Sequence, residues 1–552
     1  MLVSRRSFTT AALGVAVGSR FAVPAFAQGD ARLAGALAAI RAFGEADLAF
    51  NHLPGMTLGV VTPDGQRTVL NFGYADVEAR TPITAQTLFQ VGSITKVIVA
   101  AVLHQLAAEG RLRLTDRISE LLPQLTLPPG NGVRVQHLLD HVGGIPADAP
   151  MFPEHGLWTG YAPGTHWHYS NTGYEILGKL AEHVGRKPLA ELLRERIFVP
   201  LEMSRSRGAI VAADRALYTQ GYEAADQLPP YVRGVPLAPA PWVDVTFGAG
   251  CVASTADDML SLLRALSAAV AGKGGLGLSP LQARQFAGHI VPSDTPGMGY
   301  GNGLMHVGNG GRAYLHHTGG MLSACSSFHI DLASRVGAFS SANINAFAGY
   351  RPRLLTLYAV DALTDALSGR PIPAPPPLDP PLRNGGSYVG RYAGPAGSFE
   401  VRLGTPLTIV AGGQSAPLVQ WTGDVFRSTH PLFRNYSVMF ERAGGVIVRA
   451  GWGPNAYAHE GRGGPLSPSD PTLARLAGRY IDDNPWYGPA PVVERGGKLW
   501  IGTETPMVPV GDNLWRVGAE AWSPERASFA DLIDGRPQTF IFSGVRYARH
   551  EV

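Results

Sequence analysis

Cysteine is scarce in this chain, which has two among 552 residues. Neither Cys251 nor Cys325 stands in a zinc-binding or catalytic-cysteine pattern. We expect both to be buried free thiols, with a disulfide between them as the alternative. The pair His166 and His168 lacks the further ligands of a metal site, so neither a metal nor another cofactor is expected.

An excess of one charge and long apolar runs are also lacking. Three of the 46 basic residues and none of the 43 acidic ones lie in residues 1–27, so the remaining chain is formally neutral. This balance predicts no nucleic-acid partner. No segment reaches the roughly 18 consecutive apolar residues of a membrane-spanning helix, so stable membrane insertion is not expected either.

Residues 1–27 have the features of a bacterial export signal. Residues 4–8 (SRRSF) form a twin-arginine pattern, residues 11–18 a short apolar run, and residues 25–27 (AFA) a small-x-small cleavage site. The apolar run is too short for the alternative, a membrane anchor. We therefore expect cleavage before Gln28 and a periplasmic or secreted protein.

The remaining chain is long enough for about three structural units. Residues 371–384 are a proline-rich linker that separates a first unit from a C-terminal part rich in short strands. In that part, Gly-Arg-Tyr at 390–392 recurs 88 residues later, at 478–480. We expect two small antiparallel β-barrel modules, over 385–466 and 471–552, with one larger barrel made of two halves as the alternative.

The first unit, residues 28–370, mixes helical and strand patterns without regular alternation. Helical apolar spacing occurs at 31–50 and at about 350–367, and strand patterns at 56–62 and 67–72 are joined by a hairpin signal. Further core strands are expected near the end of the unit. These patterns predict an α+β sandwich in which helices cover an antiparallel sheet.

Ser93 and Lys96 form the most informative pair, at the start of an apolar helical pattern. Residues three apart share one face of a helix, so the Lys96 amine can lie within reach of the serine hydroxyl. A basic group in that place makes a serine nucleophilic. Lys96 is one of only five lysines in the chain, which argues against a chance pairing.

Two later segments add chemistry to this pair. Tyr169 and Asn171 carry a phenol and an amide two residues apart, so on a strand or tight turn they face the same way. His317-Thr318-Gly319 places an imidazole before a hydroxyl and a glycine in a strand pattern. A core tyrosine and a structural strand histidine are the alternatives. No Gly-x-Ser-x-Gly occurs, so an α/β-hydrolase is disfavoured.

In this order, Ser-x-x-Lys, Tyr-x-Asn and His-x-Gly resemble the motifs of the serine β-lactamase and penicillin-binding superfamily. The similar branch contains class C β-lactamases, DD-carboxypeptidases, D-aminopeptidases and related esterases, and the resemblance covers about residues 30–370. Most β-lactamases have Lys-Thr-Gly at the third motif, whereas this chain has the histidine form. Val142-Gly143 stands where relatives usually have Thr-Ser, so substrate contacts are expected to differ there.

The resemblance implies acyl transfer through a covalent serine ester on Ser93. Lys96 and Tyr169 would share the transfer of its proton, and either could be the general base, because free lysine and tyrosine both have pKa values of about 10.

The resemblance also assigns roles around the nucleophile. Asn171 would bind the substrate and orient Lys96, and the amides of Ser93 and Gly320 would form the oxyanion hole. Thr318 and Gly319 would be further substrate-binding residues. His317 would contact the substrate or the tyrosine, and an imidazole there is expected to titrate near neutrality.

The motifs and the two C-terminal modules together resemble the D-aminopeptidase architecture. We expect an exported serine hydrolase that acts on D-amino-acid peptides or amides, like a D-aminopeptidase or a DD-peptidase. A β-lactamase or short-chain carboxylesterase, and a non-catalytic binding or sensor protein for cell-wall fragments, are the alternatives. The expected partner is a small peptide, amide or ester, and the sequence does not indicate an oligomeric state.

The second C-terminal module contains an acidic, aromatic segment that the first module lacks. Residues 482–488 (DDNPWYG) follow its Gly-Arg-Tyr, whereas the first module has the shorter Ala-Gly-Pro at 393–395. This loop could reach the catalytic cleft, restrict substrate size and attract a free amine. An exposed turn is the alternative.

Overall fold

The structure is a computed structural model that describes residues 25–128, 132–225 and 231–550. Residues 1–24, which contain most of the expected export signal, lie outside the described residues. Helix α1 (Ala25–Phe50) begins at the expected cleavage site and includes the helix expected at 31–50.

A nine-stranded antiparallel sheet organises the first part of the chain, in the order β3-β2-β1-β13-β12-β11-β10-β9-β8. The expected hairpin is present, because β1 pairs with β2. The central strands of the nine-stranded sheet, β1, β12 and β13, are buried along their whole length, as in a sheet covered on both faces. The strands are β1 (Gly55–Val61), β2 (Arg67–Asp76), β3 (Thr81–Pro82), β8 (Val291–Pro292), β9 (Met298–Gly301), β10 (Leu304–Asn309), β11 (Arg312–Gly320), β12 (Cys325–Asp331) and β13 (Gly337–Ala342).

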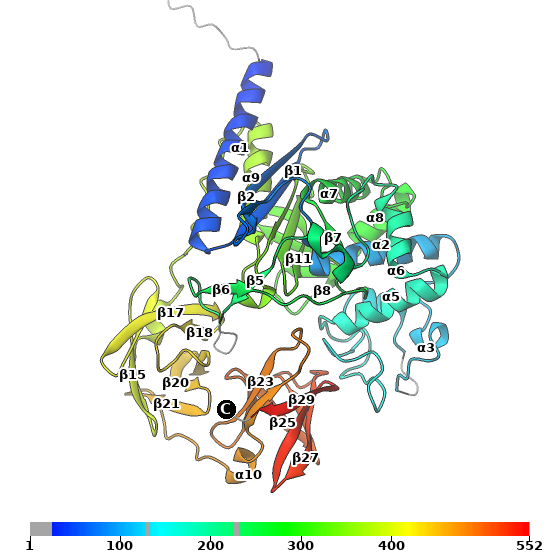
Figure 1. The fold of residues 1–552 in the computed structure, drawn as a ribbon. Helices are drawn as coiled ribbons and strands as arrows, with labels where there is room; N and C mark the ends of the chain where they lie inside the picture. Colours follow the sequence, from blue (N-terminus) through cyan, green and yellow to red (C-terminus); the bar gives the residue numbers. More distant parts are fainter. Residues whose placement is uncertain (1–24, 129–131, 226–230, 551–552) are drawn as a thin grey trace, which may run out of the picture.

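Helices cover both faces of this sheet (Figure 1). Helix α1 packs beside α9 (Arg353–Leu367), and α9 lies on β12 and β13. Helix α7 (Ala256–Val270) packs against β1 and β13 from the other face. The predicted α+β sandwich is therefore confirmed. We call this part, from α1 to α9, the α+β region.

Shorter elements complete the α+β region. The other helices are α2 (Thr95–Ala108), α3 (Ile118–Leu121), α4 (Val135–Leu139), α5 (Asn171–Gly185), α6 (Leu189–Leu193) and α8 (Pro280–Gly288). Short 3₁₀ segments are η1 (Gly92–Ile94), η3 (Ala212–Leu217) and η4 (Ala346–Ala348), and η2 (Arg194–Phe198) is a short π-helical segment. Two small sheets pair β4 (Phe89–Gln90) with β7 (Ala253–Ser254), and β5 (Tyr222–Ala224) with β6 (Leu237–Pro239).

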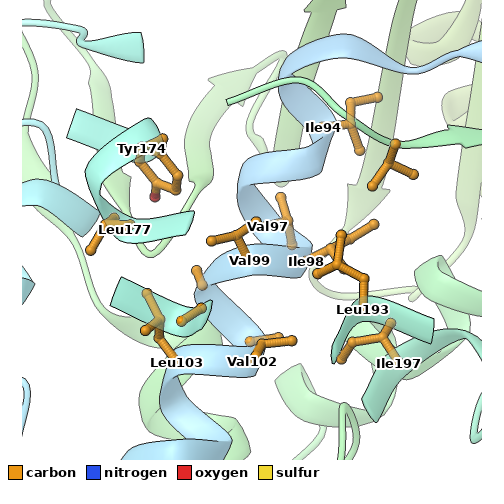
Figure 2. Packing of buried hydrophobic residues seen from close by; sticks show 14 of the residues in the cluster. Ile94, Val97, Ile98, Val99, Val102, Leu103, Tyr174, Leu177, Leu193 and Ile197 are labelled. Atoms are coloured by element: carbon orange, nitrogen blue, oxygen red, sulfur yellow. The ribbon is translucent and has the colours of Figure 1, made fainter. Parts of the chain in front are cut away.

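Helix α2 lies in the centre of the helical part of the core. Its apolar side chains point in all directions, toward Tyr174 and Leu177 of α5 on one side and toward Leu193 and Ile197 on the other (Figure 2). A helix that is apolar all round must be buried. Lys96, in the first turn of α2, is therefore surrounded by closely packed apolar side chains.

Two closed antiparallel barrels of eight strands follow the sheet and helices (Figure 1). After the turn η5 (Gly385–Tyr388), the first barrel contains β14 (Gly390–Gly394), β15 (Gly397–Arg402), β16 (Leu407–Ala411), β17 (Gln414–Thr422), β18 (Val425–Ser428), β19 (Val438–Ala443), β20 (Val446–Trp452) and β21 (Asn455–His459). After helix α10 (Pro471–Ala474), the second contains β22 (Gly478–Ile481), β23 (Pro489–Glu494), β24 (Leu499–Ile501), β25 (Thr505–Gly511), β26 (Leu514–Val517), β27 (Arg526–Ile533), β28 (Arg536–Phe542) and β29 (Val545–His550). The prediction of two small barrels is confirmed, and the alternative of one larger barrel is wrong.

The sequence repeat reflects a shared barrel core. Tyr392 and Tyr480, 88 residues apart, are both completely buried. Each tyrosine hydroxyl donates a hydrogen bond of 2.8 Å to the carbonyl four residues earlier, of Tyr388 and Leu476 respectively. The motif thus recurs because each barrel needs the same aromatic anchor with a satisfied hydroxyl.

Three further findings concern the described residues. Cys251 and Cys325 are free and buried, as expected, and the disulfide alternative is wrong. Within the described ranges, no helix is both long and apolar enough to cross a bilayer. The same ranges contain no group of three histidine, cysteine or carboxylate side chains that could hold a metal ion.

Candidate active site

Ser93 lies in the tight turn η1, which leads directly into α2. The turn requires glycine at Gly92, whose φ is +56° and whose missing Cβ would lie 2.6 Å from the amide nitrogen of Gly320. This close approach brings the last residue of β11 next to the turn that carries Ser93. The serine is therefore in a 3₁₀ turn, two residues before the first residue of the helix at whose N-terminus it was expected.

Lys96 is completely buried beneath the serine. Its ammonium donates hydrogen bonds to Ser93 Oγ at 3.0 Å, to Asn171 Oδ1 at 2.8 Å and to the carbonyl of Ala249 at 2.9 Å. Burial lowers the pKa of Lys96 to about 7, although the charges of Asp148 and Glu175 oppose this effect. At neutral pH the amine is thus divided between its charged and its neutral form.

Tyr169 precedes α5 and faces the same hydroxyl. Burial raises the pKa of its phenol, and a hydrogen bond with Ser93 only partly offsets that rise. The Lys96 Nζ lies 4.9 Å from the centre of the tyrosine ring. Tyr169 is therefore a neutral phenol in the resting site, whereas Lys96 has a neutral, basic form at physiological pH.

Asn171 is the first residue of α5 and connects two opposite charges. Its Oδ1 accepts from Lys96, and its Nδ2 donates to Asp148 Oδ1 at 2.7 Å. Ser170 caps the helix by accepting from the Gly173 amide at 2.9 Å. The hydrogen bonds of the Asn171 side chain with Lys96 and Asp148 determine the orientation of its amide.

His317 is fixed in one neutral tautomer by a chain of hydrogen bonds. Its Nδ1 must donate to the carbonyl of Thr318 (2.6 Å), so its Nε2 accepts from the Tyr300 hydroxyl (3.2 Å). The Tyr300 oxygen in turn accepts from His141 Nε2 (3.1 Å), whose Nδ1 accepts from the Ser170 amide (3.1 Å).

Burial and the nearby charge of Lys96 lower the pKa of His317 to about 3. The expectation that this imidazole titrates near neutrality is therefore wrong, because that expectation assumed a solvated histidine. His317 still lies on the pocket wall, with its ring centre 6.4 Å from that of Tyr169.

The residues after His317 differ in where they lie. Thr318 and Gly320 line the same pocket as Ser93. Gly319 does not line it, because this residue packs against the backbone of Val91, whose carbonyl oxygen would lie 1.9 Å from a Cβ. Gly319 thus allows β11 to approach the serine turn, and its contact is with protein rather than with the open pocket.

The pocket above Ser93 has a volume of about 510 Å³ and contains Tyr169, Asn171 and His317 on its walls. It is completed by the second barrel, and none of its described lining residues comes from the first. The second-barrel residues on its wall are Trp486, Tyr487, Glu525, Phe542, Ser543, Val545 and Tyr547. Trp486 and Tyr487 show that the 482–488 loop reaches the cleft, so it is not simply an exposed turn.

Glu525 fastens the second barrel to the catalytic residues. Its Oε1 accepts from the Ala147 amide at 2.7 Å and from His168 Nε2 at 2.9 Å, and Ser543 donates to its Oε2. Burial alone would raise the pKa of Glu525, but these hydrogen bonds outweigh it and the pKa lies below its usual value. A charged Glu525 thus holds the residues that directly precede Asp148 and Tyr169.

Neighbouring contacts strengthen this attachment. The Trp158 indole donates to the Pro524 carbonyl at 2.7 Å, and the rings of His166 and Trp522 stack with centres 4.9 Å apart. The two histidines that the sequence offered as an incomplete metal pair, His166 and His168, are both docking residues for the second barrel.

Several residues of this site have no recognisable sequence motif. Asp148, His141 and Tyr300 lie outside the three motifs, and the sequence did not identify them as site residues. Glu525 is separated from His168 by 357 residues and carries no local pattern.

The fold and this arrangement of serine, lysine and tyrosine define a serine hydrolase. A sequence model of the Beta-lactamase family matches residues 40–362, which is more than half of the chain, and the protein belongs to that family. The resemblance inferred from the three motifs is thereby confirmed, and the alternative of a non-catalytic binding protein is not supported.

Curated relatives match part of the chain. The β-lactamase of Escherichia coli K12 is 28% identical over 180 residues, which cover 31% of this chain and 48% of that protein. Penicillin-binding protein 4* of Bacillus subtilis 168 is 28% identical over 156 residues, which cover 25% and 34%. The matches thus span about half or less of the length of these relatives.

Solved structures share the fold over a larger part of the chain. The octameric penicillin-binding protein homologue from Pyrococcus abyssi has a TM-score of 0.54 and 23% identity, covering 76% of this chain and 99% of that chain. D-amino acid amidase from Ochrobactrum anthropi SV3 has a TM-score of 0.51 and 23% identity, covering 61% and 99%. At this identity the likeness shows a common fold.

Proposed function

We propose that this protein hydrolyses D-amino-acid peptides or amides through an acyl-enzyme on Ser93, in the manner of a D-aminopeptidase or DD-peptidase. The observation that carries the proposal is the buried amine of Lys96, 3.0 Å from Ser93 Oγ and with a pKa of about 7. A general base works best when its pKa is close to the operating pH.

The contacts support a specific order of proton transfers. Neutral Lys96 takes the proton of Ser93 as Oγ forms a bond with the substrate carbonyl carbon. The amides of Ser93 and Gly320 stabilise the oxyanion. Tyr169 donates its phenolic proton to the leaving nitrogen as the carbon–nitrogen bond breaks, and Lys96 returns the serine proton to the phenolate.

Hydrolysis of the ester repeats these steps with water. Lys96 accepts a proton from a water molecule that attacks the ester carbonyl, and the proton returns to Ser93 Oγ when the acid leaves. The net change is one amide and one water converted to an acid and an amine. In this scheme Lys96 is the general base and Tyr169 the general acid, and the lowered pKa of Lys96 supports that assignment.

Asp148 supports a substrate with a free amine. Its carboxylate is exposed to the pocket and lies next to Asn171, which is expected to bind the substrate. Desolvation raises the pKa of Asp148 within this crowded cleft, with the hydrogen bond from Asn171 opposing it. A substrate ammonium group bound there would neutralise the charge of the Asp148 carboxylate. A simple ester or a β-lactam need not contain an ammonium group.

Turnover of a small substrate panel tests the proposal. The panel contains D-alaninamide, L-alaninamide, a chromogenic cephalosporin and a short-chain ester. We expect the highest kcat/KM for D-alaninamide, and loss by several orders of magnitude in Ser93→Ala, Lys96→Ala and Tyr169→Phe, because the three act as a unit. A preference for the cephalosporin or the ester would replace this proposal with a β-lactamase or carboxylesterase.

We further propose that the protein is exported by the twin-arginine route and cleaved before Gln28. The support is the pattern in residues 1–27 alone. Replacing both Arg5 and Arg6 with lysine should abolish export. Extracytoplasmic protein that still begins with Met1 would contradict the cleavage.

The division into a hydrolase domain over 28–370, a linker and two barrel modules also remains a proposal. Limited proteolysis should cut first within residues 371–384. A first cut inside either barrel would contradict these boundaries.

A further inference from the structure

A second cavity lies where the α+β region and both barrels meet. Its volume is about 340 Å³, which is within the range of sites for small molecules, about 300–1,000 Å³. The α+β region contributes Phe347 on the turn η4, the first barrel contributes Arg427 and Asn435, and the second contributes Tyr487 and Pro489.

This cavity and the catalytic pocket share two lining residues. Phe347 and Tyr487 line both. Phe347 is 61% exposed, which is unusual for a large apolar ring and places it in open space between the two cavities. Burial raises the pKa of the Tyr487 phenol to about 12, and the charges of Glu175 and Asp148 contribute to this rise. Two aromatic side chains thus separate the catalytic pocket from its neighbour.

The second cavity is lined by the cation Arg427 and by the carboxylates Glu223 and Glu504. Arg427 donates from Nη1 to the carbonyl of Tyr231 at 3.2 Å, and its guanidinium lies 3.3 Å from the centre of the Trp421 ring. Its Nε is buried and has no hydrogen-bond partner among the described residues. Burial lowers the pKa of Arg427 to about 10, with Glu504 opposing this effect, so it is still charged at neutral pH. An anionic group bound in the cavity would form a charge-assisted interaction with this guanidinium.

We propose that the second cavity is a subsite for the leaving part of a peptide substrate, whose C-terminal carboxylate pairs with Arg427. This inference rests on the proposed function. If the free amine of the substrate binds at Asp148, the acyl part is a single residue, so only the part beyond the scissile bond can be long. That part would extend from Ser93 past Phe347 and Tyr487 into the second cavity. The preferred substrates are therefore short peptides with a free carboxylate and one D-residue at the N-terminus.

Peptides of different length test this subsite in the full chain. The substrates are D-alaninamide, D-alanyl-glycine and D-alanyl-triglycine, each measured for kcat and KM. Asn435 is exposed and lines the second cavity but not the catalytic pocket, so Asn435→Trp should fill the subsite, with Asn435→Ala as the matched control. We expect the tryptophan to lower the ratio of kcat/KM for D-alanyl-triglycine to that for D-alaninamide by about tenfold, mainly through KM, and the alanine to leave the ratio near the wild-type value.

A second variant tests the carboxylate partner without filling the cavity. Arg427→Gln should remove the preference for D-alanyl-triglycine over its C-terminally amidated form, a preference of about tenfold in the wild type. Unchanged length and carboxylate preferences in these variants, with D-alaninamide still hydrolysed, would overturn the subsite and leave the proposed function intact. Absence of turnover on every D-alanine substrate in the wild type would overturn both.

Discussion

The two barrels have the same architecture but different relations to the catalytic site. Each is a closed barrel of eight antiparallel strands with a buried tyrosine at the same repeat position. Only the second barrel lines the catalytic pocket, whereas the first reaches the α+β region at the second cavity, for example through the bond from Arg427 to Tyr231. The repeat therefore preserves a scaffold, and function depends on what its loops carry.

The barrels differ in their contacts with the catalytic site at two positions of the repeat. Glu525, just before β27, corresponds to Ser437 just before β19 of the first barrel, 88 residues earlier. The loop 482–488 corresponds to the short turn after Gly394. A carboxylate and an aromatic loop are thus the features that connect one copy of the repeat to the catalytic residues.

Among the variants that test this comparison of the barrels, the largest effect is expected from releasing the second barrel. Glu525→Ala removes the acceptor for the Ala147 amide and for His168, so the segments that carry Asp148 and Tyr169 lose their common support. We expect kcat to fall by about 100-fold, since small displacements of catalytic groups have effects of that size. Steady-state kinetics on D-alaninamide measures this loss.

A carboxylate of the first barrel provides the control for this variant. Glu460 forms an exposed ion pair with Arg391, 3.1 Å apart, and neither residue is among those described as lining the catalytic pocket. Glu460→Ala should retain wild-type kinetics because exposed ion pairs contribute little. Equal losses in the two variants would remove the distinction between the barrels.

The pH profile should report Lys96 and not the second barrel. The lowered pKa of Lys96 means that its neutral, basic form predominates above about pH 7 and is lost as the pH falls below that value. We expect kcat/KM to fall about tenfold per pH unit on the acid side. His317, with a pKa of about 3, cannot be the group responsible. An acid limb near pH 4 would contradict Lys96 as the base.

Exchanging loops between the barrels should change selectivity by a smaller factor. Replacing residues 482–488 with the Ala-Gly-Pro of 393–395 removes Trp486 and Tyr487 from the pocket wall. We expect longer acyl groups to be accepted and the preference for a free amino terminus to fall by about threefold to tenfold. A selectivity profile identical to that of the wild type would show that the loop lines the pocket without restricting it.

The smallest effects are expected from substitutions of the core tyrosine that both barrels share. Tyr392→Phe removes a buried hydrogen bond of 2.8 Å from the hydroxyl to a carbonyl. Tyr480→Phe removes the corresponding part-buried bond and the 2.8 Å bond that Arg549 Nη2 donates to the same hydroxyl. Each should lower the free energy of unfolding by about 1 kcal/mol with little change in activity. Denaturant unfolding, followed for both variants, measures this. A large loss for Tyr392→Phe alone would show that the barrels do not share the same core.

The sequence predicted the parts of the site that depend on short-range geometry. Ser93 and Lys96 are three residues apart on one turn, so their contact follows from helical spacing, and the motif order identified Tyr169 and Asn171 as their neighbours. The α+β sandwich and both barrels were predicted from periodicity and the repeat. Residue type alone, however, could not predict the titration of His317, because its pKa is set by burial and by Lys96.

Contacts between distant segments were beyond reach of the sequence. Glu525 meets His168 across 357 residues, and a single carboxylate in a strand-rich segment has no pattern that would reveal it. The 482–488 loop was recognised only because the first barrel lacks it. A repeat therefore gives information about function at the positions where its copies differ.

Covalent labelling of Ser93 tests the central claim most directly. The full-length protein would be treated with a fluorophosphonate, its intact mass measured and the modified peptide sequenced, with Ser93→Ala treated in parallel. We predict a single adduct on the peptide that contains Ser93 and none in the variant, with labelling that slows below about pH 7 as Lys96 becomes protonated. An adduct at another serine, or undiminished hydrolysis by Ser93→Ala, would contradict the account.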